Sequence, residues 1–286
     1  MKTKIIIAMH KSYTVPEEDV YLPMHVGAEG KETIEAHYGD VARGENQADA
    51  SEKQAQDEAR KNEMAQVSRD DTGENISHKN PYYCELTGLY WAWKNLDADA
   101  IGLVHYRRYF KGSGKNIMTT AEAEEIMANC DIAVPTKRKY YIESLYSHYA
   151  HTLDGDHLDK AKLIIAQRHN DYLDACEEVY NRSWGYMFNM CIMRREYLEE
   201  YCQWLFDILG ELENDIGVLE DAFSARLYGR VSEILFNVWL VHKQQENPDL
   251  RVSEVPTMHL EKVNWIKKGG AFLVAKFFGK KYKKSF

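Results

Sequence analysis

The chain has 286 residues, of which 44% are apolar and 12% aromatic, so it can bury a large core and is not disordered throughout. Its net charge of −9 excludes a general nucleic-acid-binding protein, which needs a basic surface. Five scattered cysteines without a C-x-x-C pair indicate neither a disulfide framework nor a zinc site, and they favour a reduced cytosolic compartment.

The first predicted element is a buried strand over residues 4–9, a continuous and mostly β-branched run bounded by polar residues. This run is too short for the apolar core of a signal peptide, and no segment of the chain reaches a membrane-spanning length. His10 and Lys11 follow at the carboxyl end of the strand, which is the edge where open α/β sheets bind ligands. An ordinary solvent-exposed strand exit explains the two residues equally well.

Residues 42–68 are polar and charged, with little apolar content beyond alanine and methionine. A solvated helix or a mobile loop would satisfy this composition. We predict a disordered insertion here and place no chemistry in it.

A helix is predicted over residues 80–95, where apolar side chains recur at helical spacing. Polar side chains gather at its start: Asn75, Lys79, Asn80 and Glu85. The start of a helix can hold an anion or sugar hydroxyls, because its free N–H groups point outward. The alternative is helix capping by Asn80, with the aromatic residues of the helix in the core.

The next strand, residues 100–104, runs directly into His105, Arg107 and Arg108. Cations at the end of a buried strand are costly unless they meet an anion or carboxylates. Two guanidiniums beside an imidazole suit a diphosphate, because arginine offers phosphate oxygens a planar fork of donors. The alternative is a structural pairing with acids such as Glu85.

Helices and strands continue to alternate along the rest of the chain. Helices are predicted over residues 119–129, 158–180, 196–212 and 231–242, and strands over residues 131–134 and 185–193. Alternation at this spacing predicts an α/β fold with a mostly parallel sheet that helices cover on both faces.

Two polar residues stand among apolar neighbours. Asn189 needs partners if its amide is buried, and either a sugar hydroxyl or a backbone loop would supply them. Burial would raise the pKa of the Glu233 carboxyl and suit it to act as a general base, whereas an ion pair with Arg230 is the alternative. Asp154 and Asp156 form an Asp-x-Asp sequence of the kind that binds Mg²⁺ or Mn²⁺, but no strand leads into it, which favours a loop turn.

The C-terminal segment differs from the rest of the chain in charge. Residues 262–286 hold eight lysines and no acidic residue, so the preceding residues carry −17. Aromatic and aliphatic side chains interleave with these lysines, which predicts a basic amphipathic tail over residues 259–286 that binds an anionic membrane surface. A solvated terminus is the alternative.

Several segments resemble the signature blocks of bacterial capsular and exopolysaccharide synthesis proteins that share domain of unknown function 4422, a family grouped with glycosyltransferases. The most distinctive block ends in His-Tyr-Arg-Arg-Tyr-Phe, and the resemblance covers roughly residues 4–240. The glutamate–arginine pair usual in the late helix reads Glu233-Ile234 here, and the polar insertion is also atypical. The matching segments are residues 10–11, 21–27, 73–80, 83–87, 90–95, 102–110, 189–190 and 201–209.

The resemblance implies a GT-A-like (Rossmann-like) main domain over residues 1–258, followed by the basic tail. It further implies transfer of a hexose, galactose or galactofuranose, from a UDP-sugar donor to a polysaccharide or lipid-linked oligosaccharide acceptor in capsule or exopolysaccharide synthesis. Such a protein would be cytoplasmic and peripheral on the inner face of the plasma membrane. The alternative is a catalytically inactive carbohydrate-binding or scaffolding subunit of a polysaccharide assembly complex. A nucleotide-sugar phosphohydrolase ranks last, because no convincing metal cluster is present.

In GT-A enzymes a metal bound by Asp-x-Asp stabilises the leaving diphosphate. Our hypothesis is that His105, Arg107 and Arg108 replace that metal as fixed positive charge, so that no cofactor is required, with Mn²⁺ or Mg²⁺ as the alternative. Glu233 is the candidate base, next to Arg107 and His105 as catalytic groups, and Asn189 is the candidate acceptor contact. The predicted donor-binding residues are His10, Lys11, Asn75, Lys79, Asn80, Glu85 and Arg108.

Overall fold

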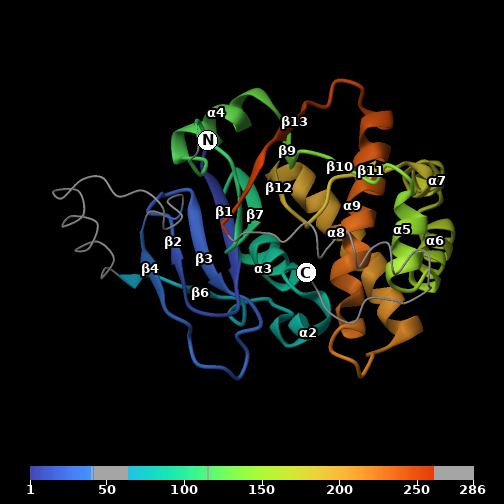
Figure 1. The fold of residues 1–286 in the computed structure, drawn as a ribbon, viewed down its shortest axis with the longest axis horizontal. Coiled ribbons are helices and arrows are strands. Elements are labelled where there is room, and N and C mark those ends of the chain that lie inside the picture. Colours follow the sequence, from blue (N-terminus) through green and yellow to red (C-terminus); the bar gives the residue numbers. More distant parts are fainter. Residues whose placement is uncertain (40, 42–63, 115, 261–286) are drawn as a thin grey trace.

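The computed structural model describes residues 1–39, 41, 64–114 and 116–260 (Figure 1). Most of the predicted insertion over residues 42–68 lies outside the described residues, although a two-residue strand, β5 (Met64–Ala65), falls at its end. The basic tail from residue 261 onward also lies outside them.

A mostly parallel central sheet organises the described part of the chain, as predicted. Its main path runs in the order β13-β9-β12-β7-β1-β3-β6, and only β12 is antiparallel to its neighbours. The strands are β1 (Thr3–Met9), β3 (Tyr21–His25), β6 (Ser68–Arg69), β7 (Ala100–His105), β9 (Ile132–Pro135), β12 (Cys191–Arg194) and β13 (Val252–Val255).

Shorter strands extend this framework. β8 (Arg108–Phe110) folds back on β7 and pairs with β14 (Thr257–His259). β2 (Tyr13–Val15) and β4 (Ala36–Tyr38) form a small sheet with β5, and β10 (Arg138–Lys139) pairs with β11 (Trp184–Gly185).

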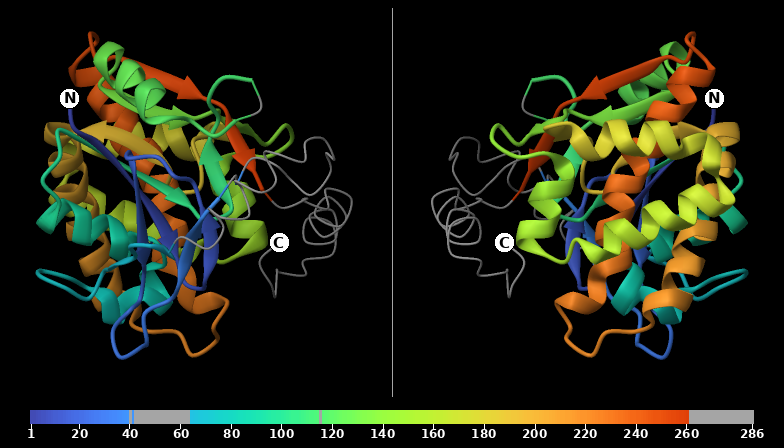
Figure 2. Two further views of the ribbon diagram at one scale, coloured as in Figure 1. Left: turned by 90° about the vertical axis from the view of Figure 1, so that its left-hand side faces the viewer. Right: turned by 90° about the vertical axis from the view of Figure 1, so that its right-hand side faces the viewer.

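The sheet separates two hydrophobic cores, because successive side chains of a strand point to opposite faces. On β1, Ile6 packs in the core with α3, α8 and α9, whereas Ile7 packs in the core with α4 (Figures 1 and 2). No described helix combines the length and apolar content needed to cross a membrane. The α-helices are α2 (Asn80–Tyr83), α3 (Leu86–Asn95), α4 (Thr120–Asn129), α5 (Leu145–Thr152), α6 (Asp156–Arg168), α7 (Leu173–Asn181), α8 (Arg195–Ile216) and α9 (Leu227–Glu246).

The helix predicted over residues 80–95 is interrupted. Cys84 adopts a positive φ of 52°, so α2 ends there and α3 begins two residues later. α9 passes close by, and a Cβ placed on Gly229 would lie 3.1 Å from the Cys84 side chain. Glycine at that position permits the close approach of α9, and the kink carries Glu85 to the sheet edge.

Two other long elements are also divided. The predicted helix over residues 158–180 is α6 and α7, separated by the 3₁₀ turn η2 (Asn170–Tyr172), after which α7 turns back to pack on α9. The predicted strand over residues 185–193 is interrupted by a turn in which Phe188 and Asn189 have φ values of 78° and 54°. That turn interrupts the strand ladder and brings both residues to the carboxyl edge of the sheet.

Candidate functional site

Three parallel strands end at the same edge of the sheet. In the register of the sheet, Ala8 lies beside His105 and Met9 beside His25. The residues that directly follow β1, β3 and β7 therefore lie close together at this edge of the sheet. This is the carboxyl edge at which open α/β sheets bind ligands. His10 and the turn between β7 and β8 therefore meet at this edge.

Three of the predicted site residues, His10, Lys11 and Arg107, lie around the buried ring of Tyr106. Tyr106 forms an edge contact with His10 at 5.2 Å between ring centroids, and Lys11 Nζ and Arg107 Cζ lie 5.7 and 4.8 Å from the Tyr106 ring centroid. Burial lowers the pKa of His10, and the positive charges of Arg107, Lys11 and Arg226 lower it further. We call His10, Lys11 and Arg107 the cationic patch; Lys11 and Arg107 supply its positive charge, which favours a bound anion.

The neighbouring Arg108 contacts different groups. Its guanidinium carbon lies 3.6 Å from the Phe188 ring centroid, and Nε donates to His259 Nδ1 at 3.3 Å. Burial lowers the pKa of Arg108, whereas the carboxylates of Glu233 and Glu85 act in the opposite direction. Arg107 and Arg108 thus contribute positive charge to the same edge of the sheet, Arg107 beside Tyr106 and Arg108 beside Phe188.

Glu233 is the carboxyl group with the clearest catalytic environment. It is half-buried on α9, where its Oε2 accepts a hydrogen bond from Phe188 N at 3.1 Å. Burial raises the pKa of Glu233, and the nearby Glu85 raises it further, against the lowering effects of the Phe188 N–H, Arg108 and Arg138. A carboxyl group of this kind, with a raised pKa and arginines nearby, is a general-base candidate.

The turn before β12 holds Asn189 between two helices. Asn189 Nδ2 donates to Glu85 Oε1 at 2.8 Å and to Gly229 O at 2.9 Å, while its Oδ1 accepts from Ser232 Oγ at 2.9 Å. His105 fixes the same turn, since its Nε2 lies 2.7 Å from Phe188 O. The protein itself therefore satisfies the buried amide, and Asn189 links Glu85 to the helix that carries Glu233.

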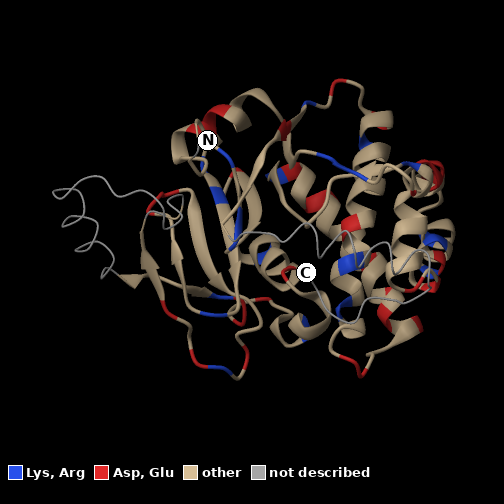
Figure 3. Ribbon diagram, viewed as in Figure 1, with Lys and Arg blue, Asp and Glu red and all other residues tan. Residues whose placement is uncertain are grey.

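Two further arginines belong to the site, and the sequence reasoning did not assign them to it. Arg226 donates from Nε to Cys84 Sγ at 3.2 Å, and its neighbours Cys84, Glu85 and Glu233 raise its pKa. Arg138 is near enough to lower the pKa of Glu233. Figure 3 shows basic and acidic positions together along α9. A signal in the sequence is the spacing of Arg230 and Glu233 by three residues, which places them on one face of α9, with Arg226 directly before that helix.

Three predicted donor-binding residues have partners of their own within the protein. Lys79 Nζ pairs with Glu213 Oε2 at 2.6 Å. Asn80 Nδ2 donates to Cys84 O at 2.7 Å and to Thr87 Oγ1, and Asn75 Nδ2 donates to Gly73 O at 3.0 Å. Their assignment to donor binding stays a prediction.

The turn after β3 is held by Asp70, which the sequence reasoning missed. This carboxylate is fully buried and accepts hydrogen bonds from Gly27 N at 2.8 Å and Ala28 N at 3.0 Å. It also accepts from the hydroxyls of Ser77 and Thr87. Four donors from three segments thus fix the loop beside the cationic patch to the start of α3.

The predicted Asp-x-Asp motif does not form a metal site with other acidic side chains at this edge. Asp154 lines a separate cavity beside α5 and α6, while Asp156 pairs with Lys160 in the first turn of α6 at 3.5 Å. Among the described residues, one group has the ligand spacing of a metal site: Asp171, His242 and Glu246. It lies at the opposite end of α9 from Arg226, so it does not contribute to the strand-end cluster.

Comparison with known proteins gave two matches. A family model described as "Domain of unknown function (DUF4422)" matches residues 4–245. Among solved structures, the chain is similar to one titled "WbbM bifunctional glycosytransferase apo structure", with a TM-score of 0.75 and 26% sequence identity. The match covers 92% of this chain and 46% of that chain, so this chain spans about half the length of its structural relative. No curated protein matched.

Proposed function

The chain belongs to the DUF4422 family, and from that premise we propose that it is a glycosyltransferase that moves a sugar from a nucleotide-sugar donor to a glycan hydroxyl. The similarity to a bifunctional glycosyltransferase supports this class of reaction. The observation that carries the proposal is the environment of Glu233, a carboxyl group with a raised pKa among arginines at the carboxyl edge of the sheet.

In the proposed reaction, the acceptor hydroxyl oxygen attacks the anomeric carbon of the donor sugar while Glu233 takes the hydroxyl proton. The bond between that carbon and the diphosphate oxygen breaks, and its electron pair leaves with the nucleoside diphosphate. A base is most effective when its pKa lies near the working pH, which is the direction in which burial moves Glu233. Asn189 and His105 act as positioning residues in this scheme, because they fix the turn whose Phe188 N–H holds Glu233.

The leaving diphosphate needs positive charge that is already in place when the bond breaks. We assign this task to Arg107, Arg108 and Arg226, with His10 and Lys11 at the nucleotide. Guanidiniums suit it, because each presents several donors to phosphate oxygens and stays charged at all working pH values. In this scheme the arginines act in place of a divalent metal ion.

The finer assignment follows the resemblance of the sequence. The donor is a UDP-hexose, galactose or galactofuranose, and the acceptor is a polysaccharide or lipid-linked oligosaccharide of capsule or exopolysaccharide synthesis. The lysines of residues 262–286 would hold the protein on the anionic inner face of the plasma membrane, where a lipid-linked acceptor is found.

The test is a donor panel of UDP-, GDP- and dTDP-sugars, with and without EDTA, followed by nucleotide release and thermal shift. Stabilisation and slow UDP release with one UDP-hexose, unchanged by EDTA, is the expected result. Activity that EDTA abolishes and Mn²⁺ restores would contradict the role of the arginines. Absence of a shift with every nucleotide sugar would instead favour the inactive scaffolding subunit.

A further inference from the structure

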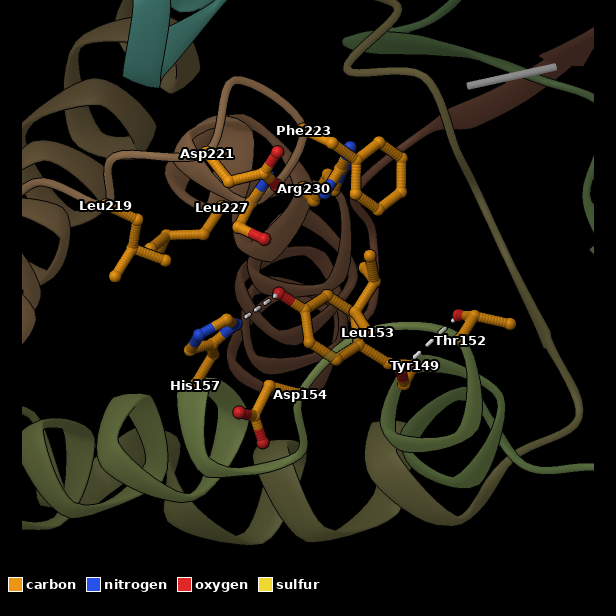
Figure 4. Close-up of a pocket in the computed structure, with 11 residues that line it drawn as sticks. Tyr149, Thr152, Leu153, Asp154, His157, Leu219, Asp221, Phe223, Leu227 and Arg230 are labelled. Carbon is orange, nitrogen blue, oxygen red and sulfur yellow. Dashed lines mark hydrogen bonds between the residues drawn. The ribbon is translucent and has the colours of Figure 1, made fainter. Parts of the chain in front are cut away.

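A cavity of about 660 Å³, lined by both polar and apolar side chains, lies between the loop that precedes α9 and the helices α5 and α6 (Figure 4). Its volume is in the range of pockets that bind small organic ligands, roughly 300–1,000 Å³. The side chains that give the cavity its character come from both sides: Tyr149, Asp154 and His157 from one, and Asp221, Phe223 and Arg230 from the other.

This cavity adjoins the proposed catalytic base. Arg230 lies three residues before Glu233 on α9, about one helical turn, and the two charges interact. On the opposite wall, the charge of Glu233 also contributes to the raised pKa of Tyr149, whose hydroxyl lies 3.2 Å from His157 Nδ1. Glu233 does not itself line the cavity, but it follows Arg230 by one helical turn, and residues on both walls are close enough to feel its charge.

Arg230 is held in the wall as a cation with unused donor capacity. Its guanidinium carbon lies 3.9 Å from the Phe223 ring centroid, and Figure 4 shows the two side chains together at one end of the cavity. Burial and the charge of Arg226 lower the pKa of Arg230, and within the described part of the chain its buried Nη2 has no hydrogen-bond partner. Leaving a buried donor unsatisfied costs stability, which is the pattern expected of a group that meets ligand oxygens.

The charges around the cavity select the kind of ligand. The carboxylates of Asp154 and Asp221 line the same space and would repel the diphosphate of a donor. Carboxylates accept hydrogen bonds from hydroxyls, a guanidinium donates to hydroxyl oxygens, and an aromatic ring packs on an apolar face. A neutral sugar ring has all three matching features: hydroxyl groups that donate, hydroxyl oxygens that accept, and an apolar face.

We propose that this cavity is the acceptor-glycan subsite, which binds at least one neutral sugar ring and presents a hydroxyl of it to Glu233. The inference deepens the proposed function and rests on it for the identity of the reaction. The donor diphosphate then occupies the strand edge with the arginines, and the acceptor occupies the space between Phe223 and Asp154.

The experiment uses the full chain with Phe223→Ala and Asp154→Asn, and with Tyr141→Ala as a matched control. Tyr141 is an aromatic residue outside the cavity whose surface is 88% exposed, so its loss removes a ring without touching the site. The acceptor probes are p-nitrophenyl hexopyranosides of galactose, glucose, mannose and rhamnose. Binding is read by saturation-transfer NMR, transfer by mass spectrometry, and donor binding by thermal shift with the nucleotide sugar.

For each cavity variant we expect the acceptor KM or Kd to rise by about tenfold, the equivalent of losing roughly one good contact, while the donor-induced thermal shift is unchanged. Tyr141→Ala should match the wild type. Glycan binding at the wild-type level in both cavity variants would overturn the proposed acceptor subsite. So would a wild-type protein that binds none of the glycans. Glycan binding that weakens in the variants without turnover of any donor would support the subsite and contradict the transferase.

Discussion

Two carboxylates of this protein, Asp70 and Glu233, have opposite surroundings. Asp70 is fully buried beneath the turn after β3 and accepts four hydrogen bonds from backbone and hydroxyl donors. Glu233 is half-buried on α9, accepts one backbone hydrogen bond from Phe188 and faces a second carboxylate, Glu85. The first carboxylate is satisfied by the protein alone, whereas the second retains capacity to take a proton or bind a substrate.

The difference in hydrogen-bond donors assigns Asp70 to the stability of the fold and Glu233 to its function. A buried charge with a full set of donors stabilises the local structure, and its removal leaves those donors unpaired. A buried carboxyl with few donors and a neighbouring like charge costs stability at neutral pH, because its ionisation is unfavourable. We therefore expect changes at Asp70 to alter folding and changes at Glu233 to alter turnover.

The largest effect is expected from Glu233→Gln, which keeps the shape of the side chain and removes its basicity. Turnover should fall by about 10²–10⁴-fold, the usual contribution of a general base, while donor binding by thermal shift is retained. Loss of donor binding together with turnover would mean that Glu233 holds the structure of the site, and the comparison with Asp70 would fail.

Asp70→Ala tests the other half of the comparison. Four donors lose their acceptor, so the free energy of unfolding should fall by about 3 kcal/mol and Tm by roughly 6–12 °C. Thermal denaturation gives the stability, and kcat measured well below the new Tm should stay within a few-fold of wild type. An unchanged Tm would show that Asp70 is not the organiser of this turn.

A smaller effect is expected from Arg107→Lys. It keeps the charge of the cationic patch but replaces the planar fork of donors with a single ammonium group, so donor Kd should rise about tenfold with kcat less affected. Arg251→Lys is the matched control, because Arg251 pairs with Asp131 at 2.6 Å at the amino ends of β9 and β13. Equal donor binding in the two variants would remove Arg107 from the diphosphate site.

The smallest expected effect is a pH-dependent stability difference. The pKa of Glu233 is raised in the folded state, so its contribution to stability is fully present below the ordinary range of a glutamate and is lost as pH rises through the raised value. Glu233→Gln lacks this loss, so its Tm relative to wild type should increase as the pH rises from the ordinary range of a glutamate through the raised pKa. A Tm difference that is constant over this range would contradict the raised pKa.

The framework of the site could be read from local sequence patterns. The apolar runs of β1 and β7 end directly before His10 and His105, so alternation of strands and helices sufficed to place them at one edge. β3 was missed because Pro23 lies within it, and proline argues against a central strand. In the described sheet, β6 pairs only with Met24 and His25, so Pro23 has a strand partner on one side, β1. The proline, which has no backbone N–H, is therefore tolerated in this strand.

The missing parts of the site depend on contacts between residues distant in sequence. Arg226 meets Cys84 across 142 positions, and Asp70 bonds to Gly27 across 43. No local pattern predicts such pairs. Nor does helical spacing show that Cys84 takes a positive φ, the kink that separates Glu85 from Lys79 and Asn80.

The central claim is that Glu233 acts as the base and that arginines stabilise the leaving diphosphate. It is tested most directly by measuring UDP release from UDP-hexoses by wild type and Glu233→Gln, with a glycan acceptor and with or without EDTA. The account predicts wild-type release that EDTA does not change, and a rate at least about 100-fold lower in the variant, which still binds the donor. Equal rates in the two proteins, or complete loss of wild-type activity in EDTA, would contradict it.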